Sequence, residues 1–260
     1  MSTPAGATTP EVLPELESYY DTVPRAGATT VEVGPFTLFL KGNPDGWHYY
    51  GRPRLGLDGP VTARDVDLLR ARQRSLRVPE SIEWVHQTTP SLRDAVLTSG
   101  LAVTDCPLLV RSAPLEAAAP GFEVRMLTAD DALAPVLGAV DAAFNGTDAV
   151  RLRAATRQER LLREGLLATA GAYDGRGTAV GGGSHGPRGT VTELTGIGVL
   201  PRARRRGVGA ALTAALVRDA RARGMRTVFL SAQDDAVARV YERVGFVRVG
   251  TACMAEPASG

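Results

Sequence analysis

The stretch that decides the fold is RARRRGVGAAL, residues 202–212. Four arginines stand among its first five positions, and Gly207 and Gly209 flank a single valine before an alanine-rich apolar run. The segment before it, TVTELTGIGVL (190–200), has the character of a strand. The segment after it, AALTAALVRDARARG (210–224), has helical spacing of apolar residues and ends in a glycine, which commonly closes a helix. The stretch is therefore predicted to be a strand-to-helix turn.

Such a turn is suited to bind phosphate. The first N–H groups of a helix have no partner within it, and the positive end of the helix dipole lies beside them. Gly207 and Gly209 allow a ligand to approach the backbone closely because they carry no Cβ. The stretch is not a P-loop, since no Lys-Ser/Thr follows, and it lacks the third glycine of the dinucleotide fingerprint. A charged turn before an ordinary helix is the alternative.

Composition limits the other classes. The 260 residues are enough for one large domain or two of ordinary size, and 44% hydrophobic content is normal for a globular core. A formal charge of +2, with no aromatic platform and no second basic cluster, argues against nucleic acid as a partner.

The remaining compositional signals are mostly negative. Cys106 and Cys253 are too few for a disulfide framework, which fits a reducing compartment. No histidine stands at ligand spacing from either cysteine, so we expect no metal. We see no signal peptide and no apolar run long enough to cross a membrane, and we expect a cytoplasmic protein with no membrane partner.

Turn and linker signals divide the chain into four parts. We expect a flexible N-terminus at 1–18, an N-terminal α/β domain at 19–114, a linker at 115–120 and a second domain at 121–260. The linker is the Ala- and Pro-rich run LEAAAP.

Within the first domain, one strand is expected at 31–40 and another at 46–53, separated by the turn Gly42-Asn43-Pro44-Asp45. A helix is expected at 61–76, with Thr62 as its N-cap and Asp65 three residues on.

The motif Arg204-x-x-Gly207-x-Gly209 resembles the Q/R-x-x-G-x-G/A motif of the GNAT superfamily of N-acetyltransferases, whose loop binds the pyrophosphate of acetyl-CoA. The run IGVLP (197–201) is similar to the family's fourth strand and the proline that often follows it. The run TVFLSAQDDAVARVYERVGF (227–246) is similar to its fifth strand, its tyrosine-bearing helix and its Gly-Phe pair.

The resemblance covers about residues 121–256. It implies an α/β (α+β) fold with a mixed, mostly antiparallel central sheet flanked by helices. A smaller, non-catalytic α/β domain is expected before it, at 19–114, and has a weaker resemblance to a degenerate unit of the same kind. The residues that the resemblance assigns to acetyl-CoA are Ile197, Gly198, Val199, Arg204, Arg205, Arg206, Gly207, Val208, Gly209, Ala210, Asp234 and Tyr241. Asp234 departs from the family, which commonly has Asn there.

The reaction implied is transfer of an acetyl group to a primary amine of a small molecule or peptide, by direct attack in a ternary complex. Tyr241 matches the general acid that protonates the leaving thiolate, and Glu193 stands where the family often has a base acting through water. The alternatives are a core tyrosine for Tyr241 and an edge-facing structural glutamate for Glu193. The N–H of Val199 or Gly198 is expected to polarise the thioester carbonyl. The chain is expected to act as a monomer or homodimer.

Other readings stay open or are set aside. A non-catalytic sensor or assembly module that binds acyl-CoA is the alternative function. The run GGSHG (182–186) fits the hydrolase elbow G-x-S-x-G, but a turn and a strand follow it instead of a helix, and no later histidine exists. His185 is expected to be a surface residue or to border the acceptor. Four aromatic residues of the first half are expected in the core, with a substrate pocket as the alternative: Trp47, Tyr49, Tyr50 and Trp84.

Overall fold

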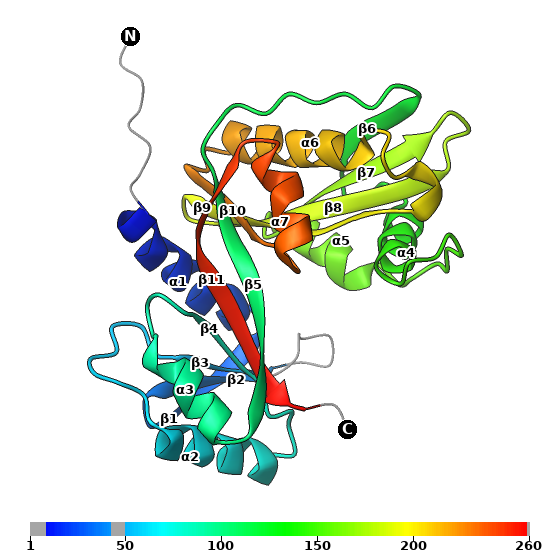
Figure 1. Ribbon diagram of the computed structural model, residues 1–260. Helices are drawn as coiled ribbons and strands as arrows, with labels where there is room; N and C mark the ends of the chain where they lie inside the picture. The colour runs from blue at the N-terminus through cyan, green and yellow to red at the C-terminus, as the bar shows by residue number, and fades with distance from the viewer. Residues whose placement is uncertain (1–8, 43–49, 259–260) are drawn as a thin grey trace. The chain divides into compact units, whose positions relative to one another are not determined.

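The computed structural model describes residues 9–42 and 50–258 and has a mixed α/β fold, as predicted. It divides into two compact units, each with its own strands and helices (Figure 1). The first unit contains the described residues up to Leu109, with Ser231–Val240 and those from Arg248 onward, and the second contains Val110–Leu230 and Tyr241–Val247.

The first unit orders its strands β1-β2-β3-β4-β11-β5. β3 and β4 run parallel, and β4 pairs antiparallel with β11. A buried cluster that includes Phe36, Trp84 and Leu92 forms its core. Its elements are α1 (Thr9–Arg25), β1 (Ala28–Val33), β2 (Phe36–Lys41), β3 (Tyr50–Pro53), α2 (Ala63–Ser75), β4 (Ile82–Val85), α3 (Ser91–Thr98), β5 (Leu101–Arg111) and β11 (Phe246–Pro257).

The second unit orders its strands β10-β9-β8-β7-β6. Helix α6 covers one face of these strands, and α4 and α5 cover the other (Figure 1). Helix α7 (Asp235–Glu242) follows β10 in the chain, and its residues up to Val240 belong to the first unit. The other elements are β6 (Phe122–Leu127), α4 (Leu133–Phe144), α5 (Thr156–Arg163), β7 (Ala168–Asp174), β8 (Ala179–Arg188), β9 (Val191–Val199), the 3₁₀ turn Pro201–Ala203, α6 (Val208–Ala222) and β10 (Thr227–Ser231).

Glycines in β8 let both helix layers approach the sheet closely. A Cβ at Gly182 would lie 2.4 Å from Val136 of α4, and one at Gly183 would lie 3.2 Å from Leu216 of α6. Successive strand residues face opposite sides of a sheet, so the glycine run serves helix packing on both faces. The run that fits the hydrolase elbow is therefore the middle of a strand.

Two expectations about the N-terminal part need correction. Residues 9–18, expected to be flexible, are helical in α1, because Val12, Leu13 and Leu16 are buried against the first unit. The single strand expected at 31–40 is a hairpin, in which a two-residue turn with Gly34 at φ +55° separates β1 from β2.

The turn expected at Gly42–Asp45 lies largely outside the described residues, as do Trp47 and Tyr49. The predicted helix at 61–76 is confirmed, with a capping box between Thr62 and Asp65. Within the described residues, no helix is both long and apolar enough to cross a membrane.

The division of the chain differs from the sequence-based boundaries at the C-terminal end. β11 was expected in the second domain, but from Arg248 onward it belongs to the first unit, where Cys253 pairs with Trp84 of β4. Cys253 also donates to Asp105, which accepts two hydrogen bonds from Arg93. Chain order alone does not reveal this return, because the pairing joins segments more than a hundred residues apart.

Candidate functional site

Strand β9 contains a bulge in its middle. Its register with β8 pairs Gly182 with Gly198 and Ser184 with Thr195, which leaves one extra residue on the β9 side. Gly196 lies within this extra step and has φ +61°, a conformation that favours glycine. A bulge bends its strand and increases the local twist, so β9 changes direction at this point.

The bulge follows the point where β9 and β10 cease to pair. Their parallel register runs from Val191 to Glu193 of β9, opposite Thr227 to Phe229 of β10. β9 itself continues to Val199, six residues beyond Glu193. Among the described residues, β9 and β10 therefore pair at one end only, and the rest of β9 has an open edge on the β10 side.

The edge of β9 presents the amide of Val199. The N–H of Leu200 donates to the carbonyl of Val180 at 2.9 Å, so these two residues form a hydrogen-bonded pair. Bonded and non-bonded pairs alternate along antiparallel strands, so the amide of Val199 points away from β8 and that of Gly198 points towards it. Val199, rather than Gly198, thus directs its N–H to the open edge.

Helix α6 begins beside this edge with unpaired amides. Gly207 is its N-cap, with φ +82°, and the carbonyl of Gly207 accepts the first helical bond, from Ala211 at 2.9 Å. The amides of Val208, Gly209 and Ala210 precede that bond and belong to the positive end of a 15-residue helix. The structure thus has the helix start that the sequence predicts at this turn, and its geometry is suited to an anion.

The two glycines of this turn have different reasons to be glycine. A Cβ at Gly207 would lie 2.7 Å from the carbonyl oxygen of Ala118, and its positive φ adds strain for any other residue. A Cβ at Gly209 would have only Val199, at 3.9 Å, nearby. The folded chain therefore requires glycine at 207, whereas the space at 209 is free for a ligand.

The three consecutive arginines before Gly207 make different contacts. Arg204 donates from Nε to the carbonyl of Val199 at 2.9 Å and from Nη2 to that of Ala143 at 2.8 Å. Arg206 lies over the ring of Phe122, 4.4 Å from its centroid. Arg205 is exposed, with φ +60°, and makes no such contact within the described residues. Arg204 therefore ties the end of β9 to α4, and Arg205 is the one most available to an anion.

Glu193 lies at the junction of three strands. It is half-buried and stands in register with Gly186 of β8 and Phe229 of β10, as the last β9 residue paired on both sides. A carboxylate here lies at the start of the open edge that ends at Val199.

Tyr241 lies on α7, with its ring in an edge-to-face contact with Phe246 at 5.8 Å. Burial raises the pKa of Tyr241 to about 12, because a phenolate would lose its hydration. The phenol is therefore protonated at neutral pH and able to donate. A fold-stabilising role accounts for the ring contact but needs no hydroxyl.

Asp234 caps helix α7. Its Oδ1 accepts from the N–H of Val237 at 2.8 Å, and its carbonyl accepts from Ala238 at 2.9 Å. Helix capping requires only an acceptor oxygen, which Asp supplies as well as Asn. The departure from the family pattern thus preserves the helix start.

His185 is not a surface residue, contrary to expectation. It is fully buried, with Nδ1 3.0 Å from Oγ1 of Thr192 and Nε2 2.9 Å from a carboxylate oxygen of Asp219. Burial lowers its pKa, an effect that the pairing with Asp219 opposes. It therefore links β8 and β9 to α6 from within the second unit.

Two features of the site were missed from the sequence. The alternating glycines of TGIGV were a signal for the bulge at Gly196, since a glycine inside a strand often marks one. The tie between Arg204 and Ala143 had no sequence signal, because 61 residues separate them. Among the described residues, no three His, Cys, Asp or Glu side chains form a possible metal-ligand group.

Residues 141–246 match the model of the Acetyltransferase (GNAT) family. None of the curated proteins matches the chain in sequence. The whole chain is similar in fold to a GCN5-related N-acetyltransferase from Kribbella flavida, with a TM-score of 0.73 and 21% identity over 95% of this chain and 96% of that one.

Two further solved structures share the fold. A GCN5-related N-acetyltransferase from Sphaerobacter thermophilus has a TM-score of 0.63 at 16% identity, over 95% of this chain and 86% of that one. A tandem GNAT protein from the clavulanic acid biosynthesis pathway has a TM-score of 0.53 at 14% identity, over 86% and 79%. The likeness in fold to these three structures therefore extends over both units of the chain.

Proposed function

Because residues 141–246 match the model of the GNAT acetyltransferase family, we propose that the protein transfers an acetyl group from acetyl-CoA to a primary amine. The observation that carries the proposal is the open N-terminus of α6 beside the unpaired edge of β9. The first feature suits a pyrophosphate, and the second suits an extended chain with amide groups that ends in a thioester.

The amides of Val208, Gly209 and Ala210 would hold the pyrophosphate, with Arg205 adding charge from the surface. Arg204 would act indirectly, since its hydrogen bond to the Val199 carbonyl fixes the peptide at the end of β9. Gly198 and Ile197 then shape the edge along which the pantetheine chain would lie.

The N–H of Val199 would polarise the thioester carbonyl and stabilise the oxyanion formed when the amine nitrogen attacks its carbon. Fixed donors of this kind stabilise the transition state because they need no reorganisation. The tie to Arg204 preserves the direction of this peptide.

Proton transfers complete the reaction. Glu193 would accept a proton from the attacking amine through a water molecule, and Tyr241 would donate one to the sulfur as the C–S bond breaks. The products are an amide and the free thiol of CoA. A phenol with a pKa of about 12 donates readily only to a sulfur that is itself poorly hydrated, so this role requires the thioester to lie in the same buried surroundings.

The test is thiol release from acetyl-CoA by the full-length protein, over a panel of small-molecule and peptide amines. We expect turnover with at least one amine. We expect Glu193→Gln to lower kcat/KM about 10- to 100-fold at neutral pH and to recover at a pH where the amine is already neutral. Acetyl-CoA binding without turnover of any amine would instead favour the acyl-CoA sensor.

An amide keeps the shape of the Glu193 side chain, so Glu193→Gln separates its two roles. A merely structural glutamate would give a loss that does not depend on pH. That result would assign Glu193 to the fold and leave the amine to be deprotonated by solvent.

A further inference from the structure

A cavity of about 690 Å³ lies in the second unit, between the segment that follows β5 and the C-terminal half of α6. Arg111, Arg218 and Arg221 line it, together with small and apolar residues such as Leu115 and Val217. Its volume is in the range of small-molecule sites. The mechanism proposed above uses none of these side chains.

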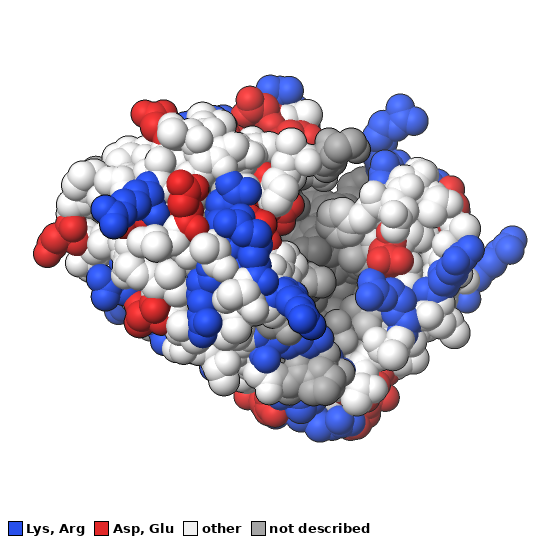
Figure 2. All heavy atoms as spheres, turned by 90° about the horizontal axis from the view of Figure 1, so that it is seen from below, with Lys and Arg blue, Asp and Glu red and all other residues white. Residues whose placement is uncertain are grey.

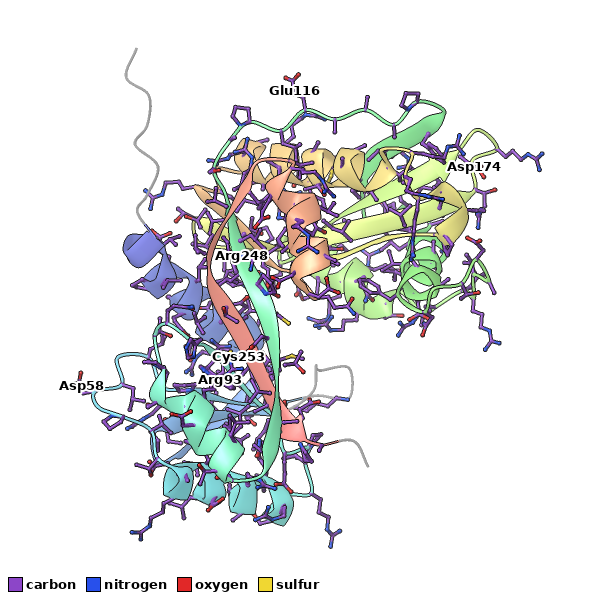
Figure 3. The ribbon with its side chains drawn as sticks, viewed as in Figure 1. Asp58, Arg93, Glu116, Asp174, Arg248 and Cys253 are labelled. Atoms are coloured by element: carbon purple, nitrogen blue, oxygen red, sulfur yellow. The ribbon has the colours of Figure 1, made fainter. Side chains whose placement is uncertain are left out.

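The three arginines lack acidic partners among residues 9–42 and 50–258. Other arginines of the chain are paired, for example Arg223 with Asp219 at 2.5 Å. Glu116 is the one acidic residue at the cavity, but it is exposed, and Figure 3 shows its side chain pointing away from α6. The cavity therefore has a net positive charge.

Arg111 provides the strongest sign of a ligand site. Its Nε is buried and has no hydrogen-bond partner, which is uncommon for so polar a group. Burial, and then the charge of Arg221, lowers the pKa of Arg111. The helix dipole accounts for Arg221, which lies in the last turn of α6, but not for a cation at the end of a strand.

A second cavity of about 340 Å³ shares Ala117, Ala118 and Arg218 with the first. Its other lining is mostly apolar and includes Phe122 and Ala215. A ligand that reaches both cavities would place a charged end among the arginines and an apolar body against these residues.

We propose that the two cavities bind a phosphate monoester with an apolar body, its phosphate held by Arg111, Arg218 and Arg221. A phosphate offers enough oxygens for several guanidinium groups, whereas one carboxylate satisfies about one. The arginine end of the site is separate from the pyrophosphate site proposed at the start of α6, because Arg218 lies nine residues after Gly209, about 14 Å along the helix axis. It is a second ligand site and does not depend on the proposed acetyl transfer.

The test is calorimetry on the full-length protein with 1-naphthyl phosphate, phenyl phosphate and inorganic phosphate, with and without saturating CoA. We expect affinity to fall in that order and to persist when CoA is present. Arg218→Gln and Arg221→Gln should each weaken 1-naphthyl phosphate about tenfold or more, because each removes a charged donor. Both residues are exposed, so these variants should fold.

Arg243→Gln is the matched control. Arg243 is exposed in the same unit, and its replacement removes one positive charge, as the two test substitutions do. An equal loss in this control would show nonspecific attraction and overturn the site, as would full displacement of 1-naphthyl phosphate by CoA. Ala215→Leu, which fills the second cavity, should weaken 1-naphthyl phosphate and spare inorganic phosphate. Equal affinities of the three probes for the wild-type protein would overturn the apolar part.

Discussion

Helices α2 and α6 occupy equivalent places in the two units, and their first turns differ in one decisive way. Each helix connects two parallel strands, β3 with β4 and β9 with β10. In α2, the Asp65 carboxylate accepts from both the amide and the hydroxyl of Thr62, at 2.9 and 2.6 Å. In α6, the cap is Gly207, which has no side chain. One helix end thus carries its own anion, and the other is free for an anion from outside.

The next helices repeat the contrast. α3 and α7 each have eight residues. The seventh position of α7 is Tyr241, and the seventh of α3 is Leu97, which is half exposed. The same position in the strand–helix–strand order therefore has a polar group in α7 and an apolar one in α3. The two units share a strand–helix–strand order, but of α2 and α6 only α6 has a first turn that leaves polar groups free to bind an anion. These free groups, more than the fold, decide where a site can form.

Gly209→Val should have the largest effect, because its side chain would occupy the space left for the pyrophosphate. A Cβ here meets no close neighbour, so the variant should fold. We expect CoA affinity in calorimetry to fall about 100-fold or more, since contacts to several amides are lost. Gly209→Ala should show a smaller loss. Unchanged affinity in a folded Gly209→Val protein would mean that the open end of α6 does not hold the pyrophosphate.

Tyr241→Phe should lower kcat about 10- to 1000-fold and leave CoA affinity unchanged, because it removes only the proton donor. Since the pKa of Tyr241 is raised to about 12, wild-type kcat should show no loss from its ionisation up to about pH 10. Full activity of the phenylalanine variant would reduce Tyr241 to a packing residue with no part in the chemistry.

Ala210→Asp transfers the acidic residue of α2 to the matching third position of α6. A carboxylate there should repel the pyrophosphate and weaken CoA about 10- to 100-fold. It should also stabilise the helix end by about 0.5 kcal/mol, so affinity and stability change in opposite directions. Ala210→Asn has the same shape without the charge and should keep most of the affinity. An equal loss in both variants would point to crowding instead of charge.

Local signals predicted much of this molecule. The cap at Thr62, the loop around Gly207 and the order of the elements in the second unit follow from residues close together in sequence. Figure 2 shows acidic side chains among the basic ones on the face in view, in line with the small net charge.

The features that escaped prediction depend on distant partners. Whether β11 pairs with β4 or with a strand of its own half is decided by packing that no short window contains. His185 reads as a surface residue until Asp219, 34 residues later, is placed beside it. The return of β11 also means that a fragment of residues 121–260 would lack its β4 partner, so the proposed roles of the second-unit residues are better tested by point variants in the full chain.

Thr62→Ala should have the smallest effect, and it tests the capped first turn of α2. The substitution removes a hydroxyl that makes two hydrogen bonds. This hydroxyl donates to the Asp65 carboxylate and accepts from the N–H of Asp65 at 3.3 Å. We expect the free energy of unfolding, from denaturant titration, to fall by about 1 kcal/mol, as for other lost N-caps. Thr62→Ser, which keeps the hydroxyl, should retain most of it. CoA affinity and kcat should not change in either variant, since the acidic cap serves only the first unit. A loss of CoA affinity in Thr62→Ala alone would mean that the α2 end contributes to the site, and the two helix ends would no longer divide into one closed and one open.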